Sequence, residues 1–133
     1  MKIDAVLKEK HKGDAEQLEL IFCEEPRIVV SAPAGCGKTT TMVSKIAREL
    51  CSGRIHSGKK VLAMTFSVNA AIKIKDSVNE LLPKLISNPE HLISKVDVAN
   101  YHQFSMRILY KYGFVINSEV EQLDEFDVVD DKD

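Results

Sequence analysis

The sequence is poor in cysteine and contains no long apolar segment. Its 133 residues include three cysteines, an odd number without C-x-x-C spacing, so the composition indicates neither a disulfide framework nor a zinc site. No apolar stretch reaches the roughly 18 residues that a membrane-spanning helix needs. The first residues, MKIDAVLKEKHKGD, are too charged for a secretory signal. We therefore expect a soluble, cytoplasmic protein of one domain, without a membrane partner.

Charge is unevenly distributed along the chain. Residues 1–118 carry 17 Lys and Arg against 12 Asp and Glu, a net charge of +5, whereas residues 119–133 carry one Lys against eight acidic residues, a net charge of −7. The basic part suits a polyanionic partner, but a solvated lysine-rich face would give the same composition. Charge alone therefore leaves both interpretations open.

The stretch RIVVSAPAGCGKTTT has the order of a strand, a phosphate-binding turn and a helix. Its β-branched run predicts a strand at 27–31, buried on both faces of a parallel sheet. Gly35 and Gly37 allow the backbone to curl around an anion, and the start of the helix adds its positive dipole end. Lys38 would reach the β- and γ-phosphates of a nucleotide, and the Thr39 hydroxyl would complete the coordination of Mg²⁺. In the alternative interpretation, the glycines only shape a turn and Lys38 lies in solvent.

Hydrophobic spacing and turn signals predict alternating strands and helices along the chain, which indicates an α/β fold with a parallel sheet. Helices should begin after capping residues and end at proline or glycine. The last helix is expected to turn an apolar face inward, formed by Phe104, Ile108, Leu109 and Tyr112. The expected helices are 15–24, 40–51, one capped by Ser67 and closed by Pro83, 90–94, and 102–112 stopped by Gly113; the expected strands are 27–31, 61–66 and 95–100.

Gln17 has two interpretations. Asp14 is the expected cap of the first helix, which places Gln17 at the third helical position of a D-x-x-Q capping box. In that role, the Gln17 side chain bonds back to the backbone of the cap. In the other interpretation, the Gln17 side chain contacts a bound nucleotide.

The residues that leave the strands are candidates for a binding site, because parallel α/β sheets bind ligands at the carboxyl ends of their strands. Thr65 and Phe66 leave the second strand, and Tyr101 and His102 leave the third. Aromatic side chains beside lysines and backbone donors hold single-stranded nucleic acid without reading its sequence. Phe66 and Tyr101 would equally suit a hydrophobic core, and the residues alone do not decide between these roles.

Four motifs, in order, resemble the N-terminal part of superfamily 1 helicases of the UvrD/Rep type. AEQ at 15–17 resembles the Q motif, and APAGCGKT is similar to the family's A-G-A-G-S-G-K-T. VLAMTFSVNAAIKIKDSV resembles a motif written roughly L-x-x-T-F-T-N-K-A-A-x-E-M, and NYHQFSMRILYKYG resembles T-F-H-S-F-x-x-x-I-L. The match covers about residues 14–131. It implies a P-loop NTPase (RecA-like) three-layer fold with a partial parallel sheet.

The resemblance also implies roles for individual residues. Lys38 and Thr39 would be catalytic, since both would act on the phosphates of ATP, and Thr39 would be the protein's contact with Mg²⁺. Gln17 would read the adenine edge. The implied nucleotide contacts are Gln17, Ala34, Gly35, Cys36, Gly37, Lys38, Thr39 and Thr40, and the implied contacts with single-stranded DNA are Thr65, Phe66, Asn100, Tyr101 and His102.

A complete helicase motor needs an acidic pair at a strand end, which holds magnesium and polarises water, and a second lobe that supplies arginines. Asp124 and Glu125 are two adjacent acidic residues, as such a pair requires. However, Glu121 and Gln122 precede them where an apolar strand is required. The chain therefore resembles only the first part of the first motor lobe.

We expect three parts: a polar leader at 1–13 with one helical turn and no assigned function, a partial RecA-like ATP-binding domain at 14–118, and an acidic C-terminal segment at 119–133. In the family's fold, the strand with the acidic pair lies between the strand at 27–31 and the third strand. Its absence would leave a gap. Because unpaired strand edges seek partners, we predict that residues 126–129 fill the gap, or that the remaining helicase lobes or a second chain complete the sheet.

The favoured function is the ATP-binding lobe fragment of a DNA-dependent ATPase and helicase that translocates on single-stranded DNA, with no hydrolysis by the fragment alone. One alternative is a stand-alone, non-catalytic module that binds a nucleotide or DNA. Another is a small P-loop phosphotransferase, which the lack of a lid-like arginine cluster disfavours.

Overall fold

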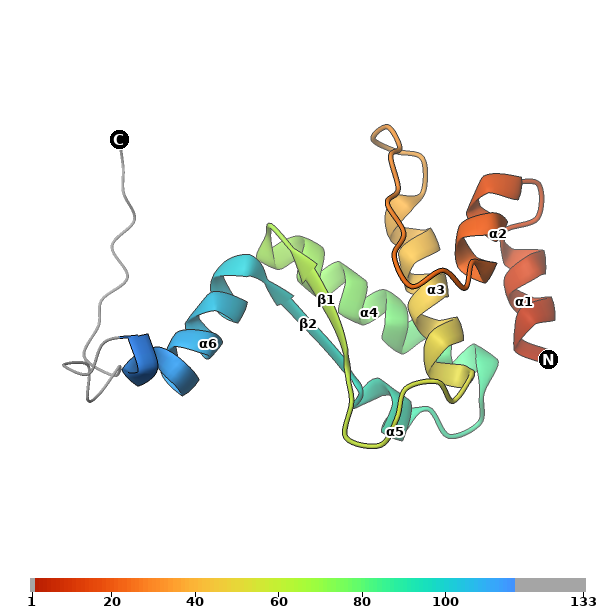
Figure 1. The fold of residues 1–133 in the computed structure, drawn as a ribbon. Coiled ribbons are helices and arrows are strands. Elements are labelled where there is room, and N and C mark those ends of the chain that lie inside the picture. The colour runs from red at the N-terminus through yellow and green to blue at the C-terminus, as the bar shows by residue number, and fades with distance from the viewer. Residues whose placement is uncertain (1, 117–133) are drawn as a thin grey trace.

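The computed structural model describes residues 2–116 of the chain. In Figure 1, α4 runs beside two strands, α1 to α3 lie on one side of the molecule and α6 projects on the other. Within the described residues, no helix has the length and apolar character needed to cross a membrane. The elements are α1 (Lys2–Lys10), α2 (Ala15–Phe22), α3 (Lys38–Cys51), β1 (Val61–Thr65), α4 (Val68–Leu85), α5 (Glu90–Ile93), β2 (Val96–Asn100) and α6 (Tyr101–Ile116).

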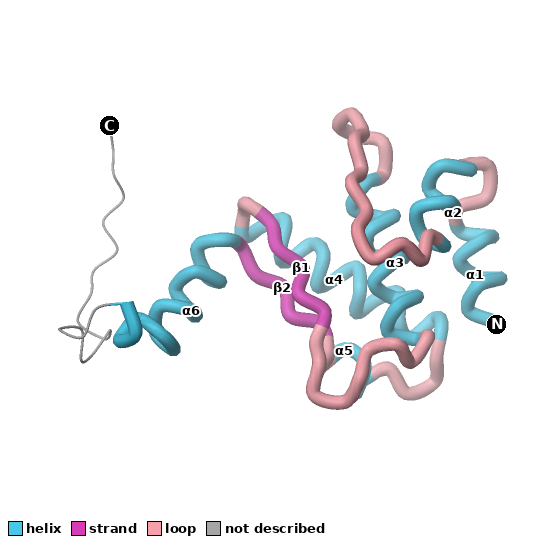
Figure 2. The backbone as a smooth tube through the Cα atoms, in the orientation of Figure 1, coloured by secondary structure: helices cyan, strands magenta, loops and turns pink. Residues whose placement is uncertain are grey.

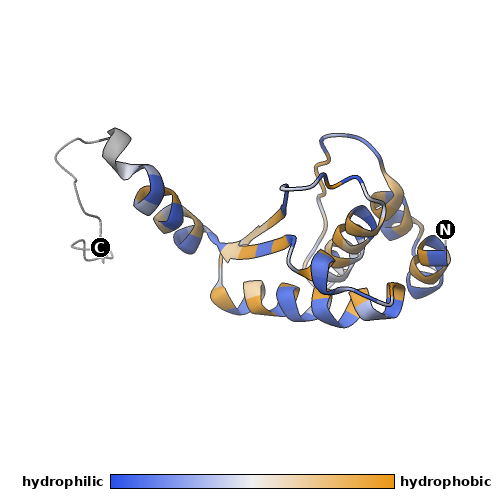
Figure 3. Cartoon of the chain, turned by 90° about the horizontal axis from the view of Figure 1, so that it is seen from below, coloured by the Kyte–Doolittle hydropathy of each residue, from blue (hydrophilic) through white to orange (hydrophobic). Residues whose placement is uncertain are grey.

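β1 and β2 form a two-stranded parallel sheet. Val61 lies opposite Val96, and Thr65 lies opposite Asn100. Helix α4 connects the strands through α5 and packs against both strands and α3, as the predicted alternation of strand and helix requires. Figure 3 shows hydrophobic and hydrophilic residues alternating along α4. The helix buries one apolar stripe, formed by Ala71, Ile74, Val78, Leu81 and Leu82.

The hydrophobic core is built mainly from α3 and α4, and α1, α2, β1 and α5 contribute one residue each. Burying one large aliphatic side chain stabilises a fold by about 1.5–3 kcal/mol. The segment expected to be a polar leader with one helical turn contributes to this core. It forms α1, and Leu7 of this helix is fully buried. The core residues are Leu7, Ile21, Val43, Ile46, Ala47, Leu50, Ala63, Ile74, Val78, Leu81, Leu82 and Leu92.

The strand predicted at 27–31 is not formed. This segment has no regular secondary structure (Figure 2), and Val29 is 97% exposed. A strand is stabilised by hydrogen bonds to a neighbouring strand, but within residues 2–116 the only paired strands are β1 and β2. Among residues 2–116, the β-branched run therefore has no strand to pair with. Residues 126–129, which we expected to fill the gap, lie outside the described residues.

Two helices continue past the residues predicted to end them. α4 passes Pro83 and ends at Leu85. The proline removes one helical hydrogen bond, but it lies at the surface while Leu82 and Leu85 pack into the core. α6 passes Gly113, which does not have the positive φ of a helix-ending glycine. A glycine inside a helix costs only about 1 kcal/mol relative to alanine, so it weakens the helix without ending it.

The inward apolar face predicted for α6 is also wrong. Ile108, Leu109 and Tyr112 are exposed, and Phe104 is half-buried. In Figure 1, α6 leaves the end of β2 and runs away from α3 and α4. Its apolar spacing gives a helix, but among the described elements nothing packs along most of its length.

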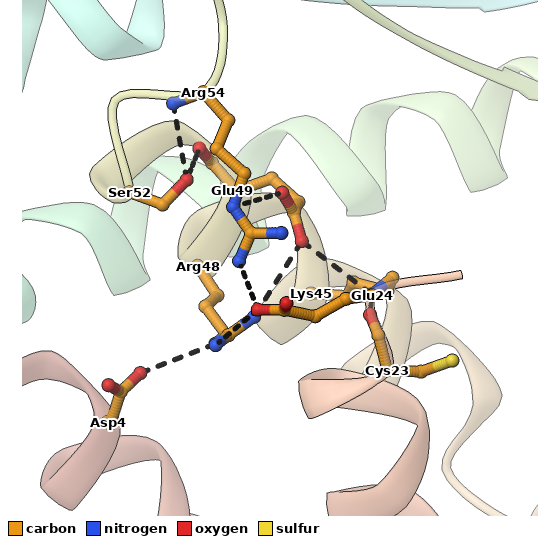
Figure 4. Close-up of polar contacts among 8 residues, drawn as sticks. All are labelled: Asp4, Cys23, Glu24, Lys45, Arg48, Glu49, Ser52 and Arg54. Carbon is orange, nitrogen blue, oxygen red and sulfur yellow. Dashed lines mark hydrogen bonds and ion pairs between the residues drawn. The ribbon is translucent and has the colours of Figure 1, made fainter. Parts of the chain in front are cut away.

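Arg48 on α3 connects α1 with the segment that follows α2 (Figure 4). Its Nε lies 3.3 Å from Asp4 Oδ1, and its Nη2 lies 3.7 Å from Glu24 Oε1. The guanidinium carbon also lies 4.7 Å from the centroid of the Phe22 ring, within the range of a cation–π interaction. The Arg48 side chain is 12% exposed, whereas that of Arg54, which pairs with the same Glu24, is 41% exposed. The cluster thus contains one nearly buried and one exposed arginine.

These two arginines form a matched pair for mutation. We expect Arg48→Met to lower the free energy of unfolding by about 2 kcal/mol, because it removes a nearly buried guanidinium and its ion pair with the partly buried Asp4. Arg54→Met removes the same charge but should cost no more than about 0.5 kcal/mol, as exposed ion pairs usually do. Urea unfolding followed by circular dichroism measures both. Equal losses for the two variants would contradict a special role for Arg48.

Candidate functional site

Two glycines shape the turn that precedes α3. Gly35 has φ +82° and Gly37 has φ +77°, conformations that other residues rarely adopt. Gly37 is also the N-cap of α3. A Cβ atom there would lie 2.9 Å from Gln17 Nε2, so glycine is required both by the backbone and by the close approach of the neighbouring side chain. Thr39 and Thr40 are exposed in the first turn of α3, where backbone N–H groups have no helical partner and can bind an anion.

Lys38 folds back over this turn. Its ammonium group donates hydrogen bonds to the carbonyl oxygens of Ala32 and Pro33, the second at 3.0 Å. The Cys36 thiol donates to the same Pro33 oxygen at 2.8 Å. Hydrogen bonds between an ammonium and a phosphate are stronger than those to a neutral carbonyl. Lys38 therefore lies where an incoming phosphate could replace its present partners.

A cavity of about 700 Å³ lies between α2, the segment before the turn and the start of α3. Three of the predicted nucleotide contacts, Gln17, Cys36 and Lys38, line it. Lys45 also lines it, and its ammonium donates to the Cys23 carbonyl oxygen at 2.7 Å. Lys45 is not among the contacts predicted from the sequence, although it follows Lys38 by seven residues, about two helical turns, and so lies on the same face of α3. The volume suits a small-molecule ligand. The two lysines lie on α3, and two acidic residues, Asp14 and Glu16, also line the cavity.

Gln17 takes part in the cap of α2 through its backbone N–H but not through its side chain. Its backbone N–H donates to Asp14 Oδ1 at 2.9 Å, which confirms Asp14 as the cap of α2. Its side chain does not bond back to the cap, because the Asp14 N–H donates to the His11 carbonyl oxygen at 3.1 Å. Instead, Gln17 Oε1 lies 2.6 Å from His11 Nδ1, and Nε2 donates to the Cys36 carbonyl oxygen at 3.4 Å. The capping-box role of the side chain is therefore wrong, and the amide lies beside the cavity.

An aromatic pair lies at the carboxyl ends of the two strands. Phe66 is 91% exposed and Tyr101 is about half exposed, and their ring centroids are 5.0 Å apart with 48° between the ring planes. This exposure rules out the core interpretation for both residues. They follow Thr65 and Asn100, which lie opposite each other in the sheet. In Figure 1, both strands end on the side of the molecule from which α6 projects, whereas the loop before α3 lies above α3 on the other side.

The other predicted DNA contacts differ in how their side chains are used. Asn100 is buried; its Oδ1 accepts from the Gln103 N–H at 2.7 Å, and Gln103 Oε1 accepts from the Asn100 N–H at 3.3 Å. This reciprocal pair is a capping box that starts α6. The Thr65 hydroxyl donates to the Ser67 carbonyl oxygen at 2.9 Å. His102 is exposed and lines a separate hollow of about 490 Å³. Thr65 and Asn100 therefore shape the strand ends, while Phe66, Tyr101 and His102 present side chains outward.

A family model described as the UvrD/REP helicase N-terminal domain matches residues 14–133. The chain belongs to the UvrD/REP helicase family. The resemblance drawn from the four motifs is thus confirmed. Family membership implies a P-loop helicase fold, and the described residues show a mixed α/β structure with a two-stranded parallel sheet.

Relatives within the UvrD/REP family are much longer than this chain. An ATP-dependent helicase/nuclease subunit from Streptococcus equi subsp. zooepidemicus (strain MGCS10565) is 26% identical over 125 residues, which are 85% of this chain and 10% of the relative. The protein of the same name from Streptococcus sanguinis (strain SK36) is 29% identical over 125 residues, again 85% and 10%. The exonuclease/helicase subunit RexA of Streptococcus pneumoniae serotype 4 is 28% identical over 126 residues, 86% and 10%. The chain thus spans about a tenth of the length of the relatives it matches.

Proposed function

We propose that this chain is part of the ATP-binding lobe of a DNA-dependent ATPase and helicase that moves along single-stranded DNA. The main support is that Gln17 and Lys38, which come from different helices, line one cavity beside the glycine turn. Similar proteins are named as subunits of an ATP-dependent helicase/nuclease, which agrees with this function. Hydrolysis would require an acidic pair and arginines from a second lobe, so we expect this chain alone to bind ATP and to hydrolyse little of it.

In the proposed complex, the triphosphate lies in the turn of residues 34–37. The Lys38 ammonium exchanges the carbonyl oxygens of Ala32 and Pro33 for phosphate oxygens, and the Gln17 amide faces the adenine. Mg²⁺ keeps several waters and takes few protein ligands beside the phosphates. The exposed Thr39 hydroxyl in the first turn of α3 suits that limited role, and the ion would neutralise phosphate charge when bound.

The DNA surface is proposed at Phe66, Tyr101 and His102. Stacking of bases on exposed aromatic rings does not depend on sequence. Removing one such ring typically weakens binding of a single strand by about 1–3 kcal/mol. We therefore expect Phe66→Ala to weaken binding of a fluorescein-labelled oligothymidine about tenfold or more in an anisotropy titration.

Tyr112→Ala is the matched control for Phe66→Ala, because it removes an exposed aromatic ring from α6, away from the strand ends. Its affinity for the oligothymidine should equal that of the unmodified chain. If Phe66→Ala and Tyr112→Ala bind the single strand equally well, the aromatic pair is not the DNA surface and that part of the proposal fails.

A further inference from the structure

His11 is a buried side chain that contacts Gln17, one of the residues that line the proposed nucleotide cavity. It follows α1, is 5% exposed and lies between α2 and α3. Its Nδ1 lies 2.6 Å from Gln17 Oε1, and its Nε2 lies 2.8 Å from the hydroxyl oxygen of Ser44, which is fully buried on α3. Three segments of the chain therefore meet at one imidazole. The sequence gives no local sign of this, since KEKHKGD has the composition of a solvated segment.

The partners of His11 determine where its hydrogen lies. Gln17 Oε1 can only accept a hydrogen bond, so Nδ1 carries the hydrogen. In the neutral imidazole, Nε2 is then an acceptor, and the Ser44 hydroxyl donates to it. Both ring nitrogens have a partner, as a buried polar side chain requires.

The same contacts fix the orientation of the Gln17 amide. With Oε1 bonded to His11, Nε2 points toward the phosphate turn and donates to the Cys36 carbonyl oxygen at 3.4 Å. The reversed amide would place an oxygen against the Cys36 carbonyl, and it would also require His11 to carry its hydrogen on Nε2 and donate it to Ser44. With the hydrogen on Nδ1, both ends of the amide have complementary partners, and Nε2 also approaches the position above Gly37.

We infer that His11 is a positioning residue that sets the base preference of the nucleotide site by holding the Gln17 amide in one orientation. The inference rests on the proposed contact between Gln17 and adenine. In adenine, N7 accepts and the 6-amino group donates, whereas in guanine both N7 and O6 accept. A fixed amide offers Nε2 to N7 and the second lone pair of Oε1 to the adenine amino group. Guanine would bring its O6 against Oε1, so the fixed amide favours adenine.

The test compares three ligands, each with magnesium, by calorimetry on the whole chain: ATP, GTP and inorganic tripolyphosphate, which has no base. We expect His11→Leu to weaken ATP binding about fivefold, with GTP and tripolyphosphate unchanged, so the preference for ATP over GTP falls by the same factor. His11→Asn keeps an amide donor at the position of Nδ1 and should retain most of the preference. Equal weakening of ATP and tripolyphosphate by His11→Leu, or no weakening of ATP, would overturn the inference.

Gln17→Ala separates this inference from the proposed function. If Gln17→Ala weakens ATP binding and a folded His11→Leu does not, the role of His11 is wrong while the adenine contact stands. If Gln17→Ala leaves ATP binding unchanged, the adenine contact fails and the inference fails with it. Should His11→Leu not fold, the imidazole ¹⁵N shifts of the unmodified chain, assigned with His11→Asn, decide: a hydrogen on Nδ1 supports the inference, and one on Nε2 alone overturns it.

Discussion

Replacing Lys38 by methionine should weaken the binding of magnesium-ATP about 100-fold. The ammonium is proposed to contact two phosphates, and charge-assisted hydrogen bonds of this kind contribute about 1.5–3 kcal/mol each. Methionine retains most of the length of the side chain without the charge. Isothermal titration calorimetry of both chains with magnesium-ATP measures the loss.

Lys59→Met is the control for Lys38→Met. It removes the same charge from an exposed position in the loop between α3 and β1, so it tests whether net charge alone attracts the nucleotide. Its affinity for ATP should stay within about twofold of that of the unmodified chain, since exposed charges are screened by salt. Comparable losses in both variants would show that the turn is not the phosphate site.

The second large effect concerns α1. Leu7 is fully buried although it lies in a charged segment, so Leu7→Ala should lower the free energy of unfolding by about 3 kcal/mol, the usual cost of truncating a buried leucine. Urea unfolding followed by circular dichroism measures this change. Val6→Ala, at the neighbouring exposed position of the same helix, should change stability by no more than about 0.5 kcal/mol. If Leu7→Ala is as mild as Val6→Ala, α1 does not belong to the core.

Local patterns predicted the elements whose stability is mostly local or whose neighbours lie close in the chain. The apolar spacing of α4, the Asp14 cap of α2 and the left-handed glycines of the phosphate turn follow from nearby residues. β1 and β2 were also predicted, because both lie in one unit with their connecting helix. These elements needed no information from distant parts of the chain.

The failed predictions involve partners that a local pattern cannot supply. Residues 27–31 have the composition of a buried strand, but a strand needs a neighbour, and within the described residues none lies beside them. The apolar side of α6 likewise has the spacing of a packed helix without an element to pack on. His11 differs from these two segments, because its neighbours in the sequence are polar but the residue is buried. Its partner Ser44 lies 33 positions away in the sequence. Roles that depend on such distant contacts become visible only in three dimensions.

The most direct measurement is a crystal structure of this chain with magnesium and a non-hydrolysable ATP analogue. The account predicts that the phosphates occupy the turn around Gly35 and Gly37, that the Lys38 ammonium leaves the carbonyl oxygens of Ala32 and Pro33 for them, and that the adenine lies against the Gln17 amide. A structure in which Lys38 keeps both carbonyl partners while the nucleotide binds elsewhere would contradict it.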